Sequence, residues 1–149
     1  MKRIIFILIV LLNGCNFHDE LYYEIAPEVQ IHVDTFYEEA AKRGVRLEKT
    51  NLIVMYELCD GIKCKWSDLY GLSFKEGDQR IVYIVDDYLV REEPDALECL
   101  VFHELGHALL YRSHTTEYSI MGERNNLLEY KGNPELREWL LDELFTPRK

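Results

Sequence analysis

The residues best suited to chemistry lie in one stretch, VFHELGHALLYRSHTTEYSIMGE, which contains an HExxH pattern. The pattern is formed by His103, Glu104 and His107. Residues four apart on an α-helix lie on the same face, one turn apart, so the two imidazoles can bind one metal ion. Glu104 is rotated by about 100° from His103, so it can lie beside the metal without binding it. The spacing predicts a metal centre with a carboxylate base next to it.

A metal ion held by three protein ligands, with a fourth position open to water, is the arrangement of catalytic zinc sites. Zinc lowers the pKa of its bound water and polarises a carbonyl group, while Glu104 acts as general base. The HExxH pattern falls on a predicted core helix, where uncompensated histidines and a glutamate would be costly. An exposed helix face with incidental histidines is the competing interpretation.

The string HELGHALLYRSH followed by SIM resembles the metzincin clan of zinc metallopeptidases, whose signature is HExxHxxGxxH followed by a tight turn with methionine. His103, Glu104, His107 and Met121 match positions of that signature. The resemblance implies a zinc-dependent peptidase, by default an endopeptidase, in which Met121 forms an apolar base beneath the metal. It covers about residues 26–145 and implies a minimal metzincin-like (zincin) domain, with the active-site helix as the floor of the cleft.

Two residues depart from the metzincin signature. Leu110 stands where the family has a glycine that turns the chain out of the helix, and Ser113 stands where it has the third histidine. Glycine adopts left-handed backbone angles easily, so without it we expect the helix to run about one residue further. An exit through residues 111–113 would bring His114 to the metal as the third ligand. The alternative, as in thermolysin-like enzymes, is a later glutamate: Glu129, Glu138 or Glu143.

Hydrophobic periodicity and turn residues predict the elements that position this stretch. In chain order they are a helix at 27–43, strands at 52–58, 69–74 and 80–87, a helix at 94–111 that carries HExxH, and a helix at 134–145. The continuous apolar run at 52–58 predicts a strand buried on both faces. The order predicts an α+β fold with a small mixed sheet packed against an N-terminal helix, the active-site helix and a C-terminal helix.

The first residues, MKRIIFILIVLLNGC, have a basic start, a short apolar run and a cysteine, which is typical of a bacterial lipoprotein signal. We expect residues 1–14 to be removed and Cys15 to carry lipid, which anchors the protein to a membrane of the bacterial cell envelope without a spanning helix. Residues 15–24 are expected to form a lipidated tether and residues 25–149 the metallopeptidase domain. An ordinary signal peptide, with Cys15 present by chance, and an uncleaved anchor are the alternatives.

The other cysteines are expected to have structural roles. Cys59 and Cys64 bracket the turn-like tetrapeptide DGIK, and disulfides are allowed outside the cytoplasm, so the two are expected to pair. A zinc knuckle is a weak alternative, because no second cysteine or histidine pair lies nearby. Cys99 is expected to be a small buried hydrophobe.

The chain is acidic, with a formal net charge of −10 at pH 7. This balance argues against nucleic acid and anionic lipid as partners. A basic substrate is compatible with it, although most such charge is a solvated surface. The expected partner is a peptide or protein substrate. Three tyrosines could donate to its oxyanion, although ordinary packing or a surface position is the favoured interpretation of each: Tyr111, Tyr118 and Tyr130.

A zinc-binding envelope lipoprotein with a binding or structural role is the alternative function. Glu104 argues against it, because a purely structural zinc site needs no base and is usually closed by a fourth protein ligand.

Overall fold

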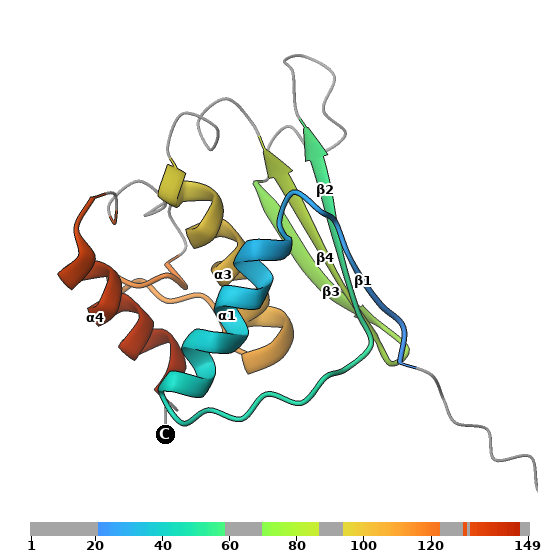
Figure 1. The fold of residues 1–149 in the computed structure, drawn as a ribbon, viewed down its shortest axis with the longest axis horizontal. Coiled ribbons are helices and arrows are strands. Elements are labelled where there is room, and N and C mark those ends of the chain that lie inside the picture. Colours follow the sequence, from blue (N-terminus) through green and yellow to red (C-terminus); the bar gives the residue numbers. More distant parts are fainter. Residues whose placement is uncertain (1–20, 59–69, 87–93, 123–129, 131, 147–149) are drawn as a thin grey trace, which may run out of the picture.

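The computed structural model describes residues 21–58, 70–86, 94–122, 130 and 132–146. Within them the chain forms one four-stranded sheet and three helices, an α+β fold as predicted (Figure 1). The elements in chain order are β1 (Tyr23–Ile25), α1 (Gln30–Lys42), β2 (Leu52–Leu58), β3 (Gly71–Glu76), β4 (Gln79–Asp86), α3 (Pro94–Leu110) and α4 (Pro134–Phe145). None of the helices among these residues has the length and apolar character that crossing a membrane requires.

The sheet is mixed, with the strand order β1-β2-β4-β3. β1 and β4 both run parallel to β2, whereas β3 forms an antiparallel hairpin with β4 and lies at one edge. The hairpin turn begins at Gly77, whose φ of 59° suits a two-residue turn. The helices lie on one side of the sheet, and α3 packs against β3 and β4 (Figure 1). The helix that carries HExxH is therefore next to the edge strand.

The sheet begins two residues before the predicted domain boundary. The sequence places residues 15–24 in a tether, but Tyr23 and Glu24 pair with β2. A strand of three residues is too short for an alternating pattern to reveal it. Only its parallel pairing with β2, far along the chain, defines it.

α1 begins three residues later than its sequence predicts. The expected first residue, Pro27, lies in a turn, and the helix starts at Gln30. The Ala26 N–H still donates to β2 at 2.9 Å, so the chain leaves the sheet only there. A turn, in which the Val29 N–H donates to the Ala26 carbonyl at 3.1 Å, must then separate strand from helix.

The remaining elements occur at or near their predicted positions. β2 and α4 have the predicted bounds, and α3 begins at the predicted Pro94. β3 and β4 both extend into the segment 75–79, which was expected to be turn, and leave only two residues between them. The Asn133 side chain caps α4 by accepting a hydrogen bond from the Leu136 N–H at 3.0 Å.

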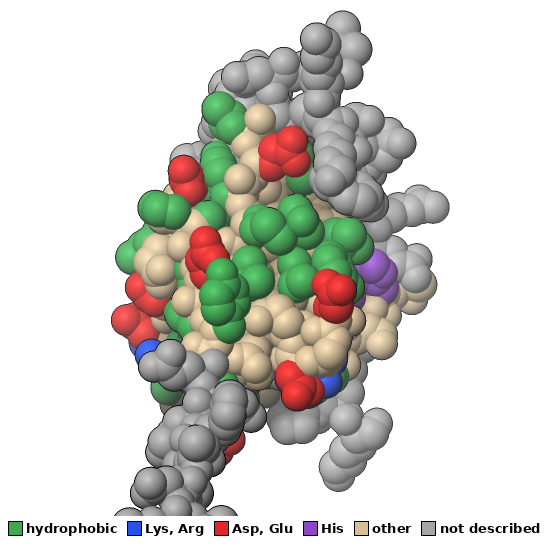
Figure 2. Space-filling model, turned by 90° about the vertical axis from the view of Figure 1, so that its right-hand side faces the viewer, with side chains coloured by type: hydrophobic (Ala, Val, Ile, Leu, Met, Phe, Trp, Pro, Cys, Tyr) green, Lys and Arg blue, Asp and Glu red, His purple; other side chains and the backbone are tan. Residues whose placement is uncertain are grey.

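The outer face of the sheet contradicts the prediction that β2 is buried on both faces. Leu52 and Val54 are buried on the helix side, but the alternate residues Ile53 and Met55 are partly exposed. Figure 2 shows the sheet side of the molecule, where hydrophobic side chains gather and acidic side chains lie around them. Strand side chains alternate between faces, and the helices of the described residues cover only one. Apolar composition therefore did not imply burial here.

The core lies between the three helices and the inner face of the sheet. The Phe36 ring centroid of α1 lies 5.2 Å from that of Phe102 in α3 and 5.0 Å from that of Phe145 in α4. All three side chains are buried, and aromatic pairs at such distances add about 0.5–1.5 kcal/mol each beyond their area burial. Cys99 is buried in this core with a free thiol, as predicted.

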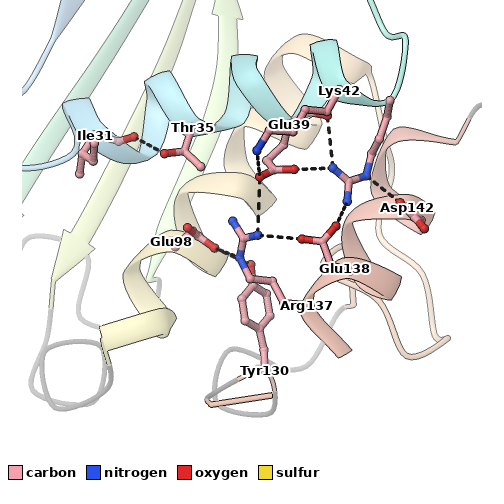
Figure 3. Close-up of polar contacts among 10 residues, drawn as sticks. Ile31, Thr35, Glu39, Lys42, Glu98, Tyr130, Arg137, Glu138 and Asp142 are labelled. Atoms are coloured by element: carbon pink, nitrogen blue, oxygen red, sulfur yellow. Dashed lines mark hydrogen bonds and ion pairs between the residues drawn. The ribbon is translucent and has the colours of Figure 1, made fainter. Parts of the chain in front are cut away.

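A cluster of charged side chains links the same three helices (Figure 3). Glu39 of α1 is buried. Burial raises its pKa, but hydrogen bonds from Lys42 and Arg43 outweigh this effect and hold the pKa below its usual value. Arg137 of α4 donates to Glu98 of α3 at 2.7 Å. The cluster is completed by Tyr130, Glu138 and Asp142.

Gly106, inside α3, lies directly against Met121. A Cβ atom added to Gly106 would lie 2.6 Å from the Met121 sulfur and 3.3 Å from Leu144 Cδ1. We predict that Gly106→Ala lowers the free energy of unfolding by about 1–3 kcal/mol, because the added methyl overpacks the contact. In a helix without that contact, the same change would stabilise by about 1 kcal/mol. Urea denaturation gives the sign, and a stabilised variant would contradict this packing.

Candidate metal centre

Three imidazole rings converge on one point beside the C-terminal half of α3. The Nε2 atoms of His103 and His107 lie 3.1 Å apart. The Nε2 atom of His114 lies 3.1 Å and 3.0 Å from them. His103 and His107 come from successive turns of α3, as their spacing predicts, and His114 comes from the segment after the helix. Together the three side chains form a group that could hold a metal ion.

The other nitrogens of two of these rings are hydrogen-bonded to the backbone. His103 Nδ1 lies 2.6 Å from the Ile120 carbonyl oxygen, and His107 Nδ1 lies 2.6 Å from that of Arg112. A carbonyl can only accept, so Nδ1 carries the proton in both neutral rings and Nε2 has a free lone pair. Two such lone pairs 3.1 Å apart cannot hydrogen-bond to each other. A cation between them would remove their repulsion, and hydrogen bonds of this outer kind orient the histidine ligands of metal sites.

The surroundings of the rings favour their neutral form, which is the form that binds metal. The pKa of His103 is lowered to about 4, mainly by burial, which outweighs the hydrogen bond to Ile120, and also by His107 and His114. The pKa of His107 is lowered by burial and by the nearby His114. Both rings are therefore neutral at pH 7.

The nitrogen positions suit a small tetrahedral cation. Bonds from zinc to imidazole nitrogen are about 2.0–2.1 Å long, which puts tetrahedral ligands about 3.3 Å apart. The Nε2 separations of 3.0–3.1 Å are close to that value. Three imidazoles would leave a fourth position open for a water molecule or a substrate.

Tyr111 makes the helix exit that delivers His114. α3 ends at Leu110, the position of the glycine in the metzincin signature, and Tyr111 has a φ of 55°. Left-handed backbone angles cost a non-glycine residue about 1–2 kcal/mol. Contacts from β4 oppose that cost, because Arg80 donates to the Ala108 carbonyl at 2.8 Å and also hydrogen-bonds to the Tyr111 hydroxyl. The left-handed residue thus comes one position after Leu110, as the spacing of His114 requires.

The segment after this exit folds back through a tight turn, in which the Gly122 N–H donates to the Ser119 carbonyl at 2.9 Å. Met121 of this turn is fully buried and lies against Gly106 of α3. The same turn carries the Ile120 carbonyl that orients the first histidine. This one turn therefore contains both Met121 and the carbonyl that holds the His103 ring.

Glu104 is buried between α3 and β3, with 5% of its surface exposed. The Ser73 side chain hydrogen-bonds to its carboxyl. Gly71 approaches so closely that a Cβ atom there would lie 2.5 Å from Glu104 Oε1. Burial raises the pKa of Glu104 to about 7, against the opposing effect of Ser73. A carboxyl that titrates near neutrality is suited to accept and release a proton.

No protein-family model, no curated protein and no solved structure matches the chain. What the site can do is therefore inferred from its own residues.

Two of the three alternative third ligands, Glu138 and Glu143, are held in other interactions. Glu143 is hydrogen-bonded to Arg112 and Ser119, and Glu138 to Arg43. Among the described residues, the group that could hold a metal ion consists of the three histidines alone. Several predicted residues lie outside the described residues, so their roles remain predictions: Cys15, Cys59, Cys64 and Glu129.

The three tyrosines considered as oxyanion donors have other interactions, which fits the favoured packing and surface roles. The Tyr111 hydroxyl hydrogen-bonds to Arg80, and the buried Tyr130 donates to Glu98 at 3.0 Å. The exposed ring of Tyr118 lies 6.1 Å from that of Trp139, centroid to centroid.

The sequence analysis did not predict the residues that contact the Glu104 carboxyl. Gly71 and Ser73 lie on β3, far from HExxH in the chain, and nothing in the motif refers to them. The one available signal was a glycine inside a predicted strand, which often marks the close approach of another group. Glu104 is that group here.

Proposed function

We propose that the protein is a zinc-dependent peptidase with a metzincin-like fold. The observation that carries the proposal is the convergence of three histidine Nε2 atoms within 3.1 Å of one another. Two of these histidines flank a buried glutamate in an HExxH motif. The turn with Met121 packed against the same helix adds support.

His103, His107 and His114 would hold the metal. A bound zinc ion would supply Lewis acidity, which makes water a better nucleophile near pH 7 and polarises the carbonyl of the substrate. Imidazole suits several transition metals, but an open site with three neutral ligands and a carboxylate base is typical of hydrolytic zinc.

Glu104 would act as the general base. It takes a proton from the attacking water and passes it to the amine nitrogen of the leaving peptide. Its side chain is fixed by the Ser73 hydrogen bond on one side and by the backbone of Gly71 on the other. A base held in this way needs little reorganisation before the proton transfer.

β3 offers a binding surface for an extended peptide. It is an edge strand, paired only with β4 among the described residues. Its first residue, Gly71, contacts Glu104, so a peptide added along this edge would run past the base. Main-chain hydrogen bonds to a sheet edge are a common mode of peptide recognition, which favours a peptide over a small metabolite as substrate.

The proposed location is the bacterial cell envelope, with the protein anchored by lipid on Cys15. Tyr23, the first residue of β1, follows Cys15 by eight positions. A fully extended chain of that length spans at most roughly 28 Å, so the domain would act close to the membrane surface. Mass spectrometry of the membrane fraction tests the lipid on Cys15.

We predict that Gly71→Ala lowers peptide hydrolysis at least about tenfold while zinc content is unchanged. The new methyl would lie 2.5 Å from Glu104 Oε1 and would displace the base. Misplacement of a catalytic group by about 1 Å can reduce rates by 100-fold. Leu72→Ala, on the opposite face of the same strand, is the control. Equal losses in the two variants would indicate a general effect on β3.

The proposed function is tested by metal analysis combined with hydrolysis of a mixed peptide library. The purified protein is expected to contain about one zinc per chain and to cleave peptides. A chelator should abolish cleavage, and added zinc should restore it. Cleavage that a chelator leaves unchanged would overturn the proposal. Bound zinc without cleavage of any peptide would favour the binding role.

A further inference from the structure

We propose that Glu143 of α4 is a positioning residue for the metal centre: its one carboxylate holds both backbone segments that orient His103 and His107. The inference deepens the proposed function and rests on its metal site, but it does not depend on peptide hydrolysis.

Each oxygen of the Glu143 carboxylate accepts one hydrogen bond, and these two bonds are called its two arms. Its Oε1 accepts a hydrogen bond from Arg112 Nη2 at 2.5 Å, and its Oε2 accepts one from Ser119 Oγ at 2.5 Å. The Glu143 and Arg112 side chains are 19% and 11% exposed. Charge-assisted bonds of this length, with little water around them, are strong and directional.

The first arm leads to His107. Arg112 binds Glu143 through its guanidinium, and its backbone carbonyl accepts a hydrogen bond from His107 Nδ1 at 2.6 Å. Arg112 also donates to the Leu144 carbonyl at the end of α4, at 3.1 Å, and to the Thr146 carbonyl just after the helix, at 2.9 Å. These bonds join the helix exit to the end of α4.

The second arm leads to His103. Ser119 Oγ donates to Glu143 and accepts a hydrogen bond from the Met121 N–H at 3.0 Å. Ile120 lies between Ser119 and Met121, and its carbonyl accepts a hydrogen bond from His103 Nδ1 at 2.6 Å. The same carboxylate therefore holds both rings indirectly. It holds His107 through Arg112, and it holds His103 through the turn that begins at Ser119.

An ionised carboxylate can hold both arms as an acceptor. It offers an acceptor oxygen to each donor, whereas a glutamine side chain offers one acceptor oxygen and an NH₂ group. In Glu143→Gln, the charge-assisted bonds to the carboxylate are lost. The amide oxygen can accept from Arg112 or from Ser119, and the NH₂ group can replace the other bond only by donating to Ser119, whose Oγ already accepts from the Met121 N–H. Arg112 keeps its bonds to the α4 carbonyls, so the helix end stays attached while the link to the rings is weakened.

The test compares Glu143→Gln with Glu138→Gln in the full chain. Glu138 is a carboxylate on the same helix that is also ion-paired, but with Arg43 and Arg137 in the charged cluster. We expect Glu143→Gln to weaken zinc binding by about 10- to 100-fold, the usual effect of losing an outer hydrogen bond to a ligand. The visible spectrum of its Co²⁺ form should change as well. Glu138→Gln should leave both unchanged.

The metal-free protein provides a readout independent of metal affinity. The ¹⁵N resonances of the imidazoles should show His103 and His107 fixed as Nδ1–H tautomers in the wild type, and tautomer exchange in Glu143→Gln. If the wild type binds zinc but cleaves no peptide, the proposed activity fails and this inference is still tested. If the wild type binds no metal, the proposed function and the role of Glu143 at a metal centre both fail.

Ser119→Ala removes one arm and keeps the test decisive if Glu143→Gln does not fold. It should change the resonances of His103 more than those of His107. The inference is overturned if Glu143→Gln keeps wild-type zinc affinity and fixed tautomers, or if Glu138→Gln lowers zinc affinity equally. It is also overturned if Ser119→Ala leaves the His103 tautomer fixed.

Discussion

Glu104→Gln is expected to lower kcat/KM for peptide hydrolysis by about 100- to 10,000-fold, the usual contribution of a general base, while zinc content is unchanged. Glutamine has nearly the same shape, so it fits between α3 and Gly71 as glutamate does. It cannot accept a proton from water at any useful pH. The loss should therefore appear in the rate of the chemical step and not in metal binding.

The measurement is a comparison of kcat/KM and zinc stoichiometry between the wild type and Glu104→Gln. Glu38→Gln, an exposed position on α1, is the matched control and should keep full activity. Unchanged hydrolysis in Glu104→Gln would refute the role of this residue as base. Loss of zinc together with activity would show that Glu104 supports the metal site instead.

His114→Ala is expected to weaken zinc binding by at least about 100-fold, more than the loss of an outer hydrogen bond to a ligand costs. The substitution leaves two imidazoles, His103 and His107, at a site built from three converging nitrogens. His114 is exposed and lies after the helix, so its removal should have little effect on the fold. Competition with a chromophoric chelator gives the affinity.

Two variants serve as controls for this experiment. Ser113→Ala changes the residue at the position of the third histidine in the metzincin signature, and His32→Ala removes a histidine of α1 outside the metal-binding group. Both should bind zinc as the wild type does. Full zinc retention in His114→Ala would exclude this residue as third ligand.

Much of the fold could be predicted because its signals are local. β2 and α4 have the predicted bounds, since a continuous apolar run and a 3.6-residue stripe each identify an element without reference to the rest of the chain. The predictions failed where an element depends on a partner. β1 exists only through its pairing with β2, and α1 starts late because the chain is still bonded to that strand at Ala26.

The exposed face of the sheet shows that apolar composition alone does not predict burial. Ile53 and Met55 belong to a strand that is apolar on both sides, yet the helices pack on one side only. Hydrophobicity indicates which residues gain by burial, but the number of covering layers depends on the whole arrangement of helices.

By itself, the sequence determined the relation of His103, Glu104 and His107, because helix geometry places residues four apart on one face wherever the helix lies. Only the tertiary structure decided the rest of the site. His114 reaches the other two rings because Tyr111 adopts left-handed angles that contacts with Arg80 stabilise. The Glu104 carboxyl lies against β3, and Glu143 of α4 bonds to Arg112 and Ser119 in the segment that follows α3. These contacts join residues far apart in the chain, and their spacing in the sequence carries no trace of them.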